Sequence, residues 1–428
     1  MSDHSAPSCS RRGVLAGVAA GALPVGLARA APASVRPTVA TWNAYIGVEL
    51  DRLFEARSLE DVRTIAGDLL DTARSHPYEA RAGAIADALV AADADVVALQ
   101  EAALVRTSPT TGSGEGTETV VDLLEAVVSA LDERGRSYEV AASSVTTDVS
   151  LPADAESGLV DLHLTDRVAL LTAADAEVQS TEGGTYDERL RLPVPGTDRT
   201  VALERGYCRA ALRFDGAAFT AVSTHLESAS APTRRQQAEE LLDILPGDEP
   251  VVVGADLNSG PGTTTTTHDT VTASLTDVHA ELRPDSEGYT CCQPSSLRND
   301  SSRLASRVDA VLTRDTSGLE AVERLGADPD DRVDATVNGE SVAVWPSDHA
   351  GVAATVELSA PTATAQPTRS DTDTATGTPA RTPTPTDTAS PTASTTARTE
   401  PTSGAGTGFG ALAALLGVVA GASVRGRE

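Results

Sequence analysis

Seven short segments of this chain each run through apolar residues and stop on a polar side chain that could serve a site for cleaving phosphodiesters. An apolar run of about four to eight residues, rich in Val, Ala and Leu, is typical of a strand that is buried on both faces. Polar groups at the exits of several such strands meet at one rim of a sheet, where active sites gather. The segments are TVATWN at Asn43, DVVALQE at Glu101, RVALL after Asp166, AVSTHLES at His225, VVVGADLNS at Asp256 and Asn258, RVDAVL at Asp309, and WPSDHAG at Asp348 and His349.

Asp256 and Asn258 have the spacing expected of groups that handle a nucleophilic water. Hydrolysis of a phosphate ester needs an attacking water, donors for the charged phosphoryl oxygens and help for the leaving oxygen. Side chains two residues apart share a face of an extended segment, so both groups are predicted to reach the same water. Asp256 is expected to orient this water or to take its proton.

Two histidines are predicted to donate hydrogen bonds to the phosphoryl oxygens, His225 in THLES and His349 in SDHAG. A neighbouring carboxylate normally fixes the tautomer of a histidine in such a role. We expect Asp309 to be the partner of His349 and Asp166 to be the partner of His225. An isolated histidine more often lies at the surface or in the core, so this prediction depends on the ordered set of segments.

Glu101, with Asn43 beside it, fits a sparse magnesium site. Mg²⁺ is a hard cation that proteins hold through one or two carboxylates and otherwise leave to water and substrate. Mn²⁺ and Ca²⁺ are alternatives with the same preference for oxygen. Taken alone, Glu101 is equally well explained as a solvated charge at the start of a helix.

Helical patterns separate these strands within a body that we place at residues 36–358. Strands and helices alternate, but CRAALRF is followed almost directly by FTAVSTHL, so strands also adjoin one another. This mixture predicts an α+β sandwich and argues against a strictly parallel sheet. The helical patterns lie at Leu59–Ala73, at RAGAIADALVAADA, at Val120–Gly135 and at RRQQAEELLDIL.

The chain of 428 residues is strongly acidic, with a formal net charge of −29 from 62 acidic and 33 basic residues, and every basic residue is Arg. Because the charge is spread along the chain, it indicates a surface adapted to molar salt, where the Debye length is about 3 Å. An acidic protein of low salt is the alternative. Proteins that bind nucleic acid without sequence preference present a basic face, so nucleic acid is disfavoured as a partner. A local patch of Arg205, Arg209 and Arg213 keeps it an alternative.

The four cysteines are expected to be structural. Cys9 precedes the presumed cleavage site, which leaves Cys208 and the adjacent pair Cys291 and Cys292 with either one disulfide or none. Neighbouring cysteines are not expected to bond each other, because the eight-membered ring strains the peptide. Zinc is not expected, since no second Cys/His pair has the spacing of its ligands.

Both ends of the chain predict export and attachment to the cell surface. In residues 1–30, Arg11 and Arg12 precede an apolar stretch that ends in an A-x-A arrangement, which resembles a twin-arginine signal. Residues 359–403 are rich in Thr and Pro and predict an extended stalk. The apolar segment within residues 404–428 is short for a full span and resembles the sorting tail of archaeal surface proteins, with a plain membrane anchor as the alternative.

The ordered series WN, LQE, THLES, GADLNS, RVD and SDH resembles the endonuclease/exonuclease/phosphatase superfamily over nearly all of residues 36–358. The resemblance implies a four-layered α/β/β/α sandwich of two mixed sheets flanked by helices. It also implies metal-dependent hydrolysis of a phosphate ester. The segments EGYTCCQPSSLRN and VWPSDHAG are similar to a secreted branch of the superfamily, and Ala255 departs from the glycine that usually precedes the motif Asp.

The same resemblance implies a role for each matched residue. Asn43 and Glu101 look like metal and phosphate ligands, with Asp348 near the metal; Asp256 and Asn258 look like the water-positioning pair, His349 with Asp309 like the supporting dyad, and His225 like the oxyanion stabiliser.

These observations predict an exported, monomeric, metal-dependent phosphodiesterase or phosphatase that acts on a lipid headgroup or another ester outside nucleic acid. Its partners would be the phosphate-ester substrate and a membrane, reached through the C-terminal tail or a lipid. An extracellular endonuclease and a catalytically inactive surface binding protein on the same fold are the alternatives.

Overall fold

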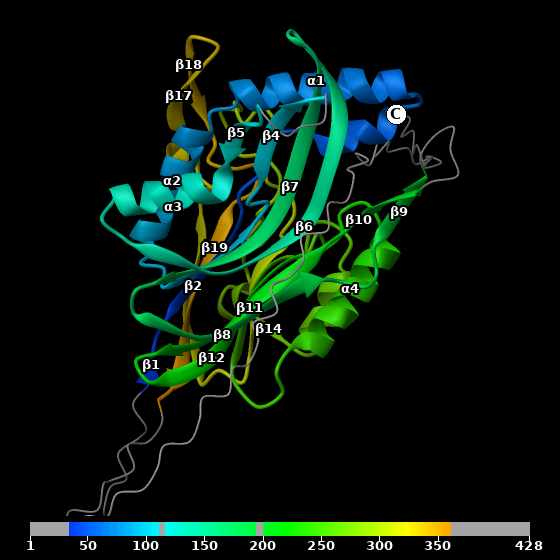
Figure 1. Cartoon of the computed structure of the whole chain (residues 1–428). Helices are drawn as coiled ribbons and strands as arrows, with labels where there is room; N and C mark the ends of the chain where they lie inside the picture. Colours follow the sequence, from blue (N-terminus) through cyan, green and yellow to red (C-terminus); the bar gives the residue numbers. More distant parts are fainter. Residues whose placement is uncertain (1–33, 111–115, 194–199, 361–428) are drawn as a thin grey trace, which may run out of the picture. The chain divides into compact units, whose positions relative to one another are not determined.

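A computed structural model describes residues 34–360 apart from 111–115 and 194–199 (Figure 1). The predicted export signal, the C-terminal apolar segment and all but the first residues of the predicted stalk lie outside the described residues, as does Cys9. Within the described ranges, no helix is long and apolar enough to cross a membrane.

Two large sheets organise the described residues, and both contain parallel and antiparallel pairs. The order in the first sheet is β1 (Ser34–Val35), β19 (Gly351–Ser359), β2 (Thr38–Asn43), β3 (Val96–Gln100), β7 (Gly158–Ala173), β4 (Leu104–Pro109) and β5 (Glu118–Asp122), with β16 (Gly318–Leu325) beside β19 and β6 (Tyr138–Ala155) beside β7. The order in the second sheet is β14 (Thr276–Asp277), β15 (Asp309–Arg314), β13 (Val251–Asp256), β12 (Ala217–His225), β11 (Gly206–Phe214) and β8 (Ala176–Thr185). Two small hairpins pair β9 (Leu190–Pro193) with β10 (Thr200–Leu203) and β17 (Val333–Val337) with β18 (Glu340–Val344).

Helices pack on the outer face of each sheet. Helices α1 (Leu59–Ser75), α2 (Tyr78–Ala91) and α3 (Leu123–Glu133) share one apolar cluster with the first sheet. Helices α4 (Ala231–Ile244) and α5 (Thr266–Thr272) share another with the second sheet, on the opposite side of the molecule (Figure 1). The short elements are α6 (Val278–Leu282), η1 (Leu50–Glu55) and η2 (Pro329–Asp331).

Alternation along the buried strands builds the layers. In β3, Val96 and Ala98 join the cluster between the two sheets, whereas Val97 and Leu99 face the helices. The same two-residue period in β13 sends Val252 between the sheets and its neighbours toward α4 and α5. Successive side chains of a strand point to opposite faces, so a strand that is apolar throughout requires cover on both sides. The predicted four-layered α/β/β/α sandwich is confirmed.

The two sheets approach each other closely at Gly254 of β13. A Cβ atom added there would lie 2.5 Å from the Cβ of Ala98 and 3.0 Å from that of Thr41. A glycine inside a strand commonly marks such a close approach. This contact brings β13 against β2 and β3 just before the strands reach the rim that carries Asp256.

One predicted helix begins later than expected. The pattern at Val120–Gly135 predicts a helix from its first residue, but Glu118–Asp122 forms β5 and the helix starts at Leu123. Asp122 is its N-cap, and its side chain accepts a hydrogen bond from the backbone N–H of Glu125. Because a capping Asp takes extended backbone angles, it ends a strand as readily as it starts a helix.

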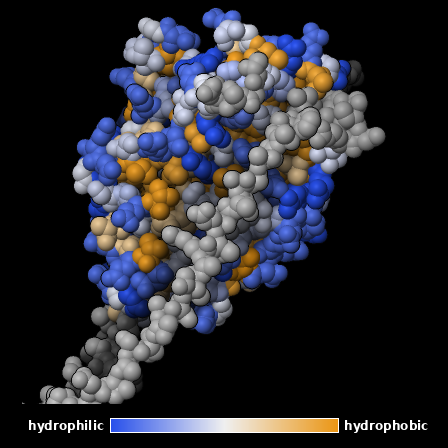
Figure 2. All heavy atoms as spheres, viewed as in Figure 1, coloured by the Kyte–Doolittle hydropathy of each residue, from blue (hydrophilic) through white to orange (hydrophobic). Residues whose placement is uncertain are grey.

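Hydrophilic side chains cover much of the face shown in Figure 2, with apolar ones among them. Five large apolar side chains of the described residues are well exposed: Leu59, Val140, Val145, Leu159 and Val178.

Candidate active site

The predicted residues gather at one rim of the two sheets, although not all of them leave a strand. Asn43 ends β2, Glu101 follows β3, and His225 and Asp256 end the parallel neighbours β12 and β13. The prediction that every segment stops on its polar residue is wrong at three of them. Asp309 begins β15, Asp166 lies inside β7, and the segment with Asp348 and His349 is a loop before β19. The rim is still shared, because β15 runs antiparallel to β13, with Asp309 opposite Asp256, and β19 runs antiparallel to β2.

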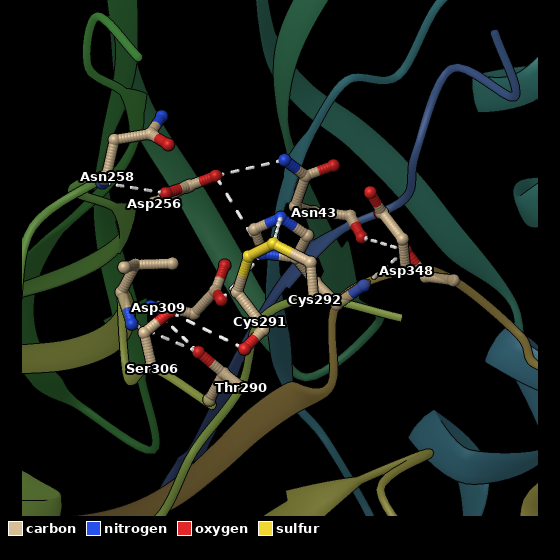
Figure 3. The surroundings of a disulfide bond; sticks show 12 residues. Asn43, Asp256, Asn258, Thr290, Cys291, Cys292, Ser306, Asp309 and Asp348 are labelled. Atoms are coloured by element: carbon tan, nitrogen blue, oxygen red, sulfur yellow. Dashed lines mark hydrogen bonds and ion pairs between the residues drawn. A yellow bond between two sulfur atoms is a disulfide. The ribbon is translucent and has the colours of Figure 1, made fainter. Parts of the chain in front are cut away.

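Asp256 lies at the centre of the site. Its Oδ2 accepts a hydrogen bond from Asn43 Nδ2 at 3.0 Å, and its Oδ1 accepts one from the backbone N–H of Asn258 at 2.9 Å. Figure 3 shows Asp256 between Asn258 and Asn43. The side chain is only 1% exposed. Burial, together with the nearby carboxylate of Asp309, raises the pKa of Asp256 to about 6, which suits a base that works near neutrality.

His349 and Asp309 form the predicted pair, with 2.8 Å between Nδ1 and the carboxylate Oδ2. Burial opposes charge on the imidazole, but the carboxylates of Asp309, Asp348 and Asp256 outweigh it and hold the pKa of His349 well above its usual range. The imidazole is therefore a charged donor. Asp309 is in turn held by the hydroxyl of Thr290, which accepts the backbone N–H of Asp309 at 3.2 Å.

The loop that carries His349 is fastened to β2. The hydroxyl of Ser347 donates to the carbonyl of Asn43 at 2.7 Å and accepts the backbone N–H of His349 at 3.2 Å. The indole Nε1 of Trp42 donates to the carbonyl of His349 at 3.0 Å. Residues far apart in the sequence are thus held in one fixed arrangement.

His225 is oriented by Arg205, and the expected contact with Asp166 is not made. Arg205 Nη1 lies 3.1 Å from His225 Nδ1, which favours the tautomer with its proton on Nε2. Nε2–H then faces Asp256 Oδ2 at 3.4 Å. Asn258 Nδ2 lies 3.1 Å from Nε2 but is itself a donor, and it donates to the carbonyl of Leu226 at 2.9 Å. Burial and the charge of Arg205 place the pKa of His225 well below its usual range, so this imidazole is neutral.

Asp166 forms an ion pair with Arg205. Its Oδ2 lies 3.7 Å from Arg205 Nη1 and accepts a hydrogen bond from Thr146 Oγ1 at 2.9 Å. Burial, followed by the charge of Glu101, raises the pKa of Asp166 to about 6. The prediction that Asp166 contacts His225 is corrected, because Arg205 Nη1 is the neighbour of both side chains and occupies the position at His225 Nδ1 that was expected for the carboxylate.

Glu101, Asn43 and Asp348 form the oxygen-rich side of the site. Glu101 Oε1 accepts from Asn43 Nδ2 at 3.1 Å, and its Oε2 accepts from the backbone N–H of Ile46 at 2.9 Å. Burial raises the pKa of Asp348 to about 7, and the charge of Glu101 adds to that shift. A bound cation would stabilise the ionised form of such a buried carboxylate.

The donor atoms on this side fit a hard divalent cation, because they are carboxylate and carboxamide oxygens. A second grouping of ligand atoms lies within 4.8 Å of one another at Asp256, Asp309 and His349. In that grouping, the hydrogen bond between Asp309 and His349 already uses one ligand atom of each residue. Glu101, Asn43 and Asp348 are the better candidates for the metal, because they offer oxygen ligands alone, whereas the protonated His349 opposes a cation. Asn43 Oδ1 accepts the backbone N–H of Tyr45 at 3.0 Å and would bind the cation through its second lone pair.

Three residues at the rim have left-handed backbone although none is glycine: Tyr45, Glu101 and Asn258, with φ of 56°, 50° and 48°. Such angles are uncommon for residues with a Cβ atom and concentrate at functional sites. Each of the three follows a strand end by one or two residues. The turns aim Glu101 and the backbone N–H of Asn258 back over the ends of the strands.

The adjacent cysteines are bonded to each other, and the expectation that they would not be is wrong. The peptide between Cys291 and Cys292 is cis, with the Cα atoms 3.0 Å apart, so both side chains point the same way. Cys292 Sγ lies 3.9 Å from His349 Nε2, and Figure 3 shows the disulfide among the site residues. Cys208 is buried between the sheets as a free thiol.

Sequence reasoning assigned no role at the site to Arg205 or Glu227. Arg205 entered only as one of three arginines in a patch, and Glu227 follows the THLES histidine by two residues. In the structure Arg205 lies beside Asp166 and His225, and Glu227 lies 3.9 Å from Arg205. The available signal was position, since each flanks an apolar strand at the same end as a predicted site residue.

Known proteins resemble the chain in sequence profile and in fold. The profile of the Endonuclease/Exonuclease/phosphatase family matches residues 40–349. A Bacteroides vulgatus endonuclease/exonuclease/phosphatase is similar in structure, with 16% identity, a TM-score of 0.46, and coverage of 76% of this chain and 99% of that one. The mannosyl-6-phosphatase Bt3783 of Bacteroides thetaiotaomicron has 17% identity, a TM-score of 0.45, and coverage of 75% and 99%. For D. rerio TDP2 complexed with single strand DNA product, the values are 15%, 0.42, 75% and 98%. No curated protein matches the chain significantly.

Proposed function

Because the chain belongs to the endonuclease/exonuclease/phosphatase family, we propose that it hydrolyses a phosphate ester at the rim that holds Asp256, with a divalent cation, Mg²⁺, as cofactor. The observation that carries this proposal is the position of Asp256. This buried carboxylate receives hydrogen bonds from both sheets and faces the His349–Asp309 pair. That arrangement supplies a base and several donors around one small space.

In this proposal Asp256 takes the proton of the attacking water, since its pKa of about 6 leaves it ionised near neutrality. Asn258 helps to hold the water. His349, kept charged by Asp309, and the neutral Nε2–H of His225 donate to the phosphoryl oxygens, and Arg205 adds a positive charge. Donors already oriented before the reaction stabilise a developing charge most effectively.

Glu101, Asn43 and Asp348 are the residues that would hold the cation. When bound there, Mg²⁺ would neutralise charge on the phosphoryl oxygens and favour departure of the leaving oxygen. The hydrogen bonds of Asn43 and Ile46 to Glu101 fix the direction of that carboxylate.

Hydrolysis of p-nitrophenyl phosphate and bis-p-nitrophenyl phosphate in molar salt tests the activity. We expect EDTA to abolish turnover, and Asp256→Asn or His349→Ala to lower kcat by about 10²-fold or more. His163→Ala is the matched control, because His163 bonds to Ser108 away from the rim. If the wild-type chain and His349→Ala are equally inert toward every ester tried, the hypothesis of a catalytically inactive binding protein replaces that of an enzyme.

The metal site is tested separately by calorimetric titration with Mg²⁺. Glu101→Gln should weaken binding, whereas Asp309→Asn should lower kcat and leave the affinity for Mg²⁺ close to that of the wild type. The reverse result would move the cation to the grouping of Asp256, Asp309 and His349. Plasmid nicking by the wild type would favour the nuclease alternative, which the charge of −29 disfavours.

We also propose that a monomeric chain works outside the cell while attached to its surface. The support is the Arg11–Arg12 pair before an apolar stretch, the Thr/Pro-rich segment and the apolar segment at residues 404–428. Replacing both arginines with Lys should retain the protein in the cytoplasm, and truncation after residue 403 should release it into the medium. Unchanged fractionation of both variants would contradict the proposal.

A further inference from the structure

A cavity of about 230 Å³ opens beside Glu101, Asp166 and Arg205. Its remaining walls are mostly apolar and come from separate parts of the chain: the segment after β2, the 3₁₀ helix η1, and strands β6, β7 and β10. The apolar side chains are Ile46, Val48, Leu50, Leu53, Phe54, Val149, Leu164 and Leu203.

Four of these side chains, Leu50, Phe54, Val149 and Leu203, are only half-buried, although they pack against the core cluster under the first sheet. They come from three elements and face one space. Apolar side chains that line a concave surface gain stability when an apolar group displaces water from it. A cavity of about 150 Å³ already admits a benzene ring, so this one has room for an aryl group or a short alkyl chain.

The polar end of the cavity contains a second feature that points to a ligand. Glu227 lines the cavity and is 1% exposed, yet its Oε2 receives no hydrogen bond from any described residue; the nearest charge is Arg205 Nε at 3.9 Å. A buried carboxylate oxygen without a donor is unfavourable. A bound molecule or its water can supply that donor.

We propose that this cavity receives an apolar substituent of the substrate, so that the enzyme acts on phosphate esters in which an alkyl or aryl group is attached to an ester oxygen that does not leave. The inference rests on the proposed function, because the phosphate must lie at the rim for its substituent to enter the cavity. Glu101 joins the two places: Asn43 of the rim donates to one of its oxygens, and the backbone of Ile46 in the cavity wall donates to the other. The exposed acidic residues Glu49 and Asp51 at the cavity disfavour a second phosphate there and hence a polynucleotide.

Binding of two unreactive phosphonates tests the assignment. Calorimetry with Mg²⁺ in molar salt would compare methylphosphonate with n-butylphosphonate. Burial of each added methylene should tighten binding about fourfold, or about sixtyfold for all three. Butylphosphonate should also show the more negative heat-capacity change.

Two matched variants on β6 test whether the tighter binding of butylphosphonate arises in the cavity. Val149→Phe fills the cavity and should reduce the ratio of the two dissociation constants to near one, with methylphosphonate binding unchanged. Val140→Phe places the same ring on the same strand where Val140 is 44% exposed, and it should keep the wild-type ratio. If Val149→Phe does not fold, Phe54→Ala should lower the ratio by removing part of the wall.

The outcomes separate the two proposals. Equal affinity of the wild type for both phosphonates, or an unchanged ratio in the cavity variants, overturns the cavity assignment and leaves the phosphoesterase intact. If neither phosphonate binds, the phosphate site is refuted, and both proposals fall with it. In kinetics with p-nitrophenolate as the common leaving group, kcat/KM for the butyl ester should exceed that for the methyl ester by a similar factor.

Discussion

Among the arginine–histidine pairs of the described residues, Arg81 with His76 and Arg205 with His225 have the same composition and different surroundings. Arg81 Nη1 lies 2.7 Å from His76 Nε2, and Arg205 Nη1 lies 3.1 Å from His225 Nδ1. In both pairs burial, followed by the charge of the arginine, lowers the pKa of the histidine. The pairs differ in what else the arginine contacts.

Backbone carbonyls accept most of the hydrogen bonds that the guanidinium of Arg81 donates. Its Nε donates to the carbonyl of Pro346 at 2.9 Å, and its Nη2 donates to the carbonyls of Ala44 and Tyr45. The side chain is fully buried, and its guanidinium also lies over the rings of Tyr45 and Tyr78. Arg81 therefore joins the segment after β2 to the loop before β19, the two places that carry Asn43 and His349.

Arg205 is held more loosely and faces carboxylates. It lies 3.7 Å from Asp166 and 3.9 Å from Glu227, its bond to the hydroxyl of Ser228 is 3.4 Å long, and 16% of its side chain is exposed. Long contacts leave donors free for a stronger acceptor such as a phosphoryl oxygen. The acceptors around an arginine therefore distinguish a structural cation from one that is available to a substrate.

Arg81→Met should give the largest effect and should act on stability. Removing the guanidinium leaves several buried carbonyls without donors, so the free energy of unfolding should fall by about 3–5 kcal/mol. Chemical denaturation measures the change. Arg52→Met, which breaks an exposed ion pair with Asp68, should cost less than about 1 kcal/mol. Equal losses in the two variants would contradict the structural role of Arg81.

Arg205→Met should act on the reaction. We expect kcat/KM to fall about 10²-fold, because a preorganised donor to the phosphoryl oxygens is lost, while the free energy of unfolding changes little. Arg209→Met is the control on the adjoining strand, where Arg209 pairs with Glu182. Full activity in Arg205→Met would remove this residue from the site.

His76→Gln should have the smallest effect and should appear only in acid. The folded pKa of His76 is about 2, whereas an unfolded histidine titrates near 6.5, so the unfolded state binds the extra proton throughout the interval between them. The wild type therefore loses stability as the pH falls below about 6.5, by about 2 kcal/mol between pH 7 and pH 5. Gln can still accept from Arg81 but does not titrate. Unfolding measured at both pH values should show a smaller loss for the variant, and identical losses would show that His76 is protonated in the fold.

The buried strands and most helices could be predicted because their signal is local. A run such as VVVGAD can be stable only with cover on both faces, and Leu59–Ser75 has a capping box between Ser58 and Asp61 at its start. The start of α3 was misjudged for a local reason as well. Asp122 serves both as the end of a strand and as an N-cap, and the letters do not separate these roles.

The candidate residues could be named from their segments, but their partners could not all be assigned. The bond between Asp309 and His349 was predicted, whereas the contact of His225 went to Arg205 and not to Asp166. Strand direction decides which ends meet, and Asp309 reaches the rim only because β15 runs antiparallel to β13. A cavity made from η1, β6, β7 and β10 has no local signal, since each wall residue reads as an ordinary core position.

By itself, the sequence determined which groups are available: buried strands, an acid-rich surface, and the carboxylates, amides and imidazoles at the strand ends. Their contacts, the acceptors around each arginine and the apolar space beside the carboxylates depend on the tertiary structure. The reason is physical: a residue's type fixes what it can donate or accept, whereas its distance from a partner depends on how distant strands pair and how the sheets pack.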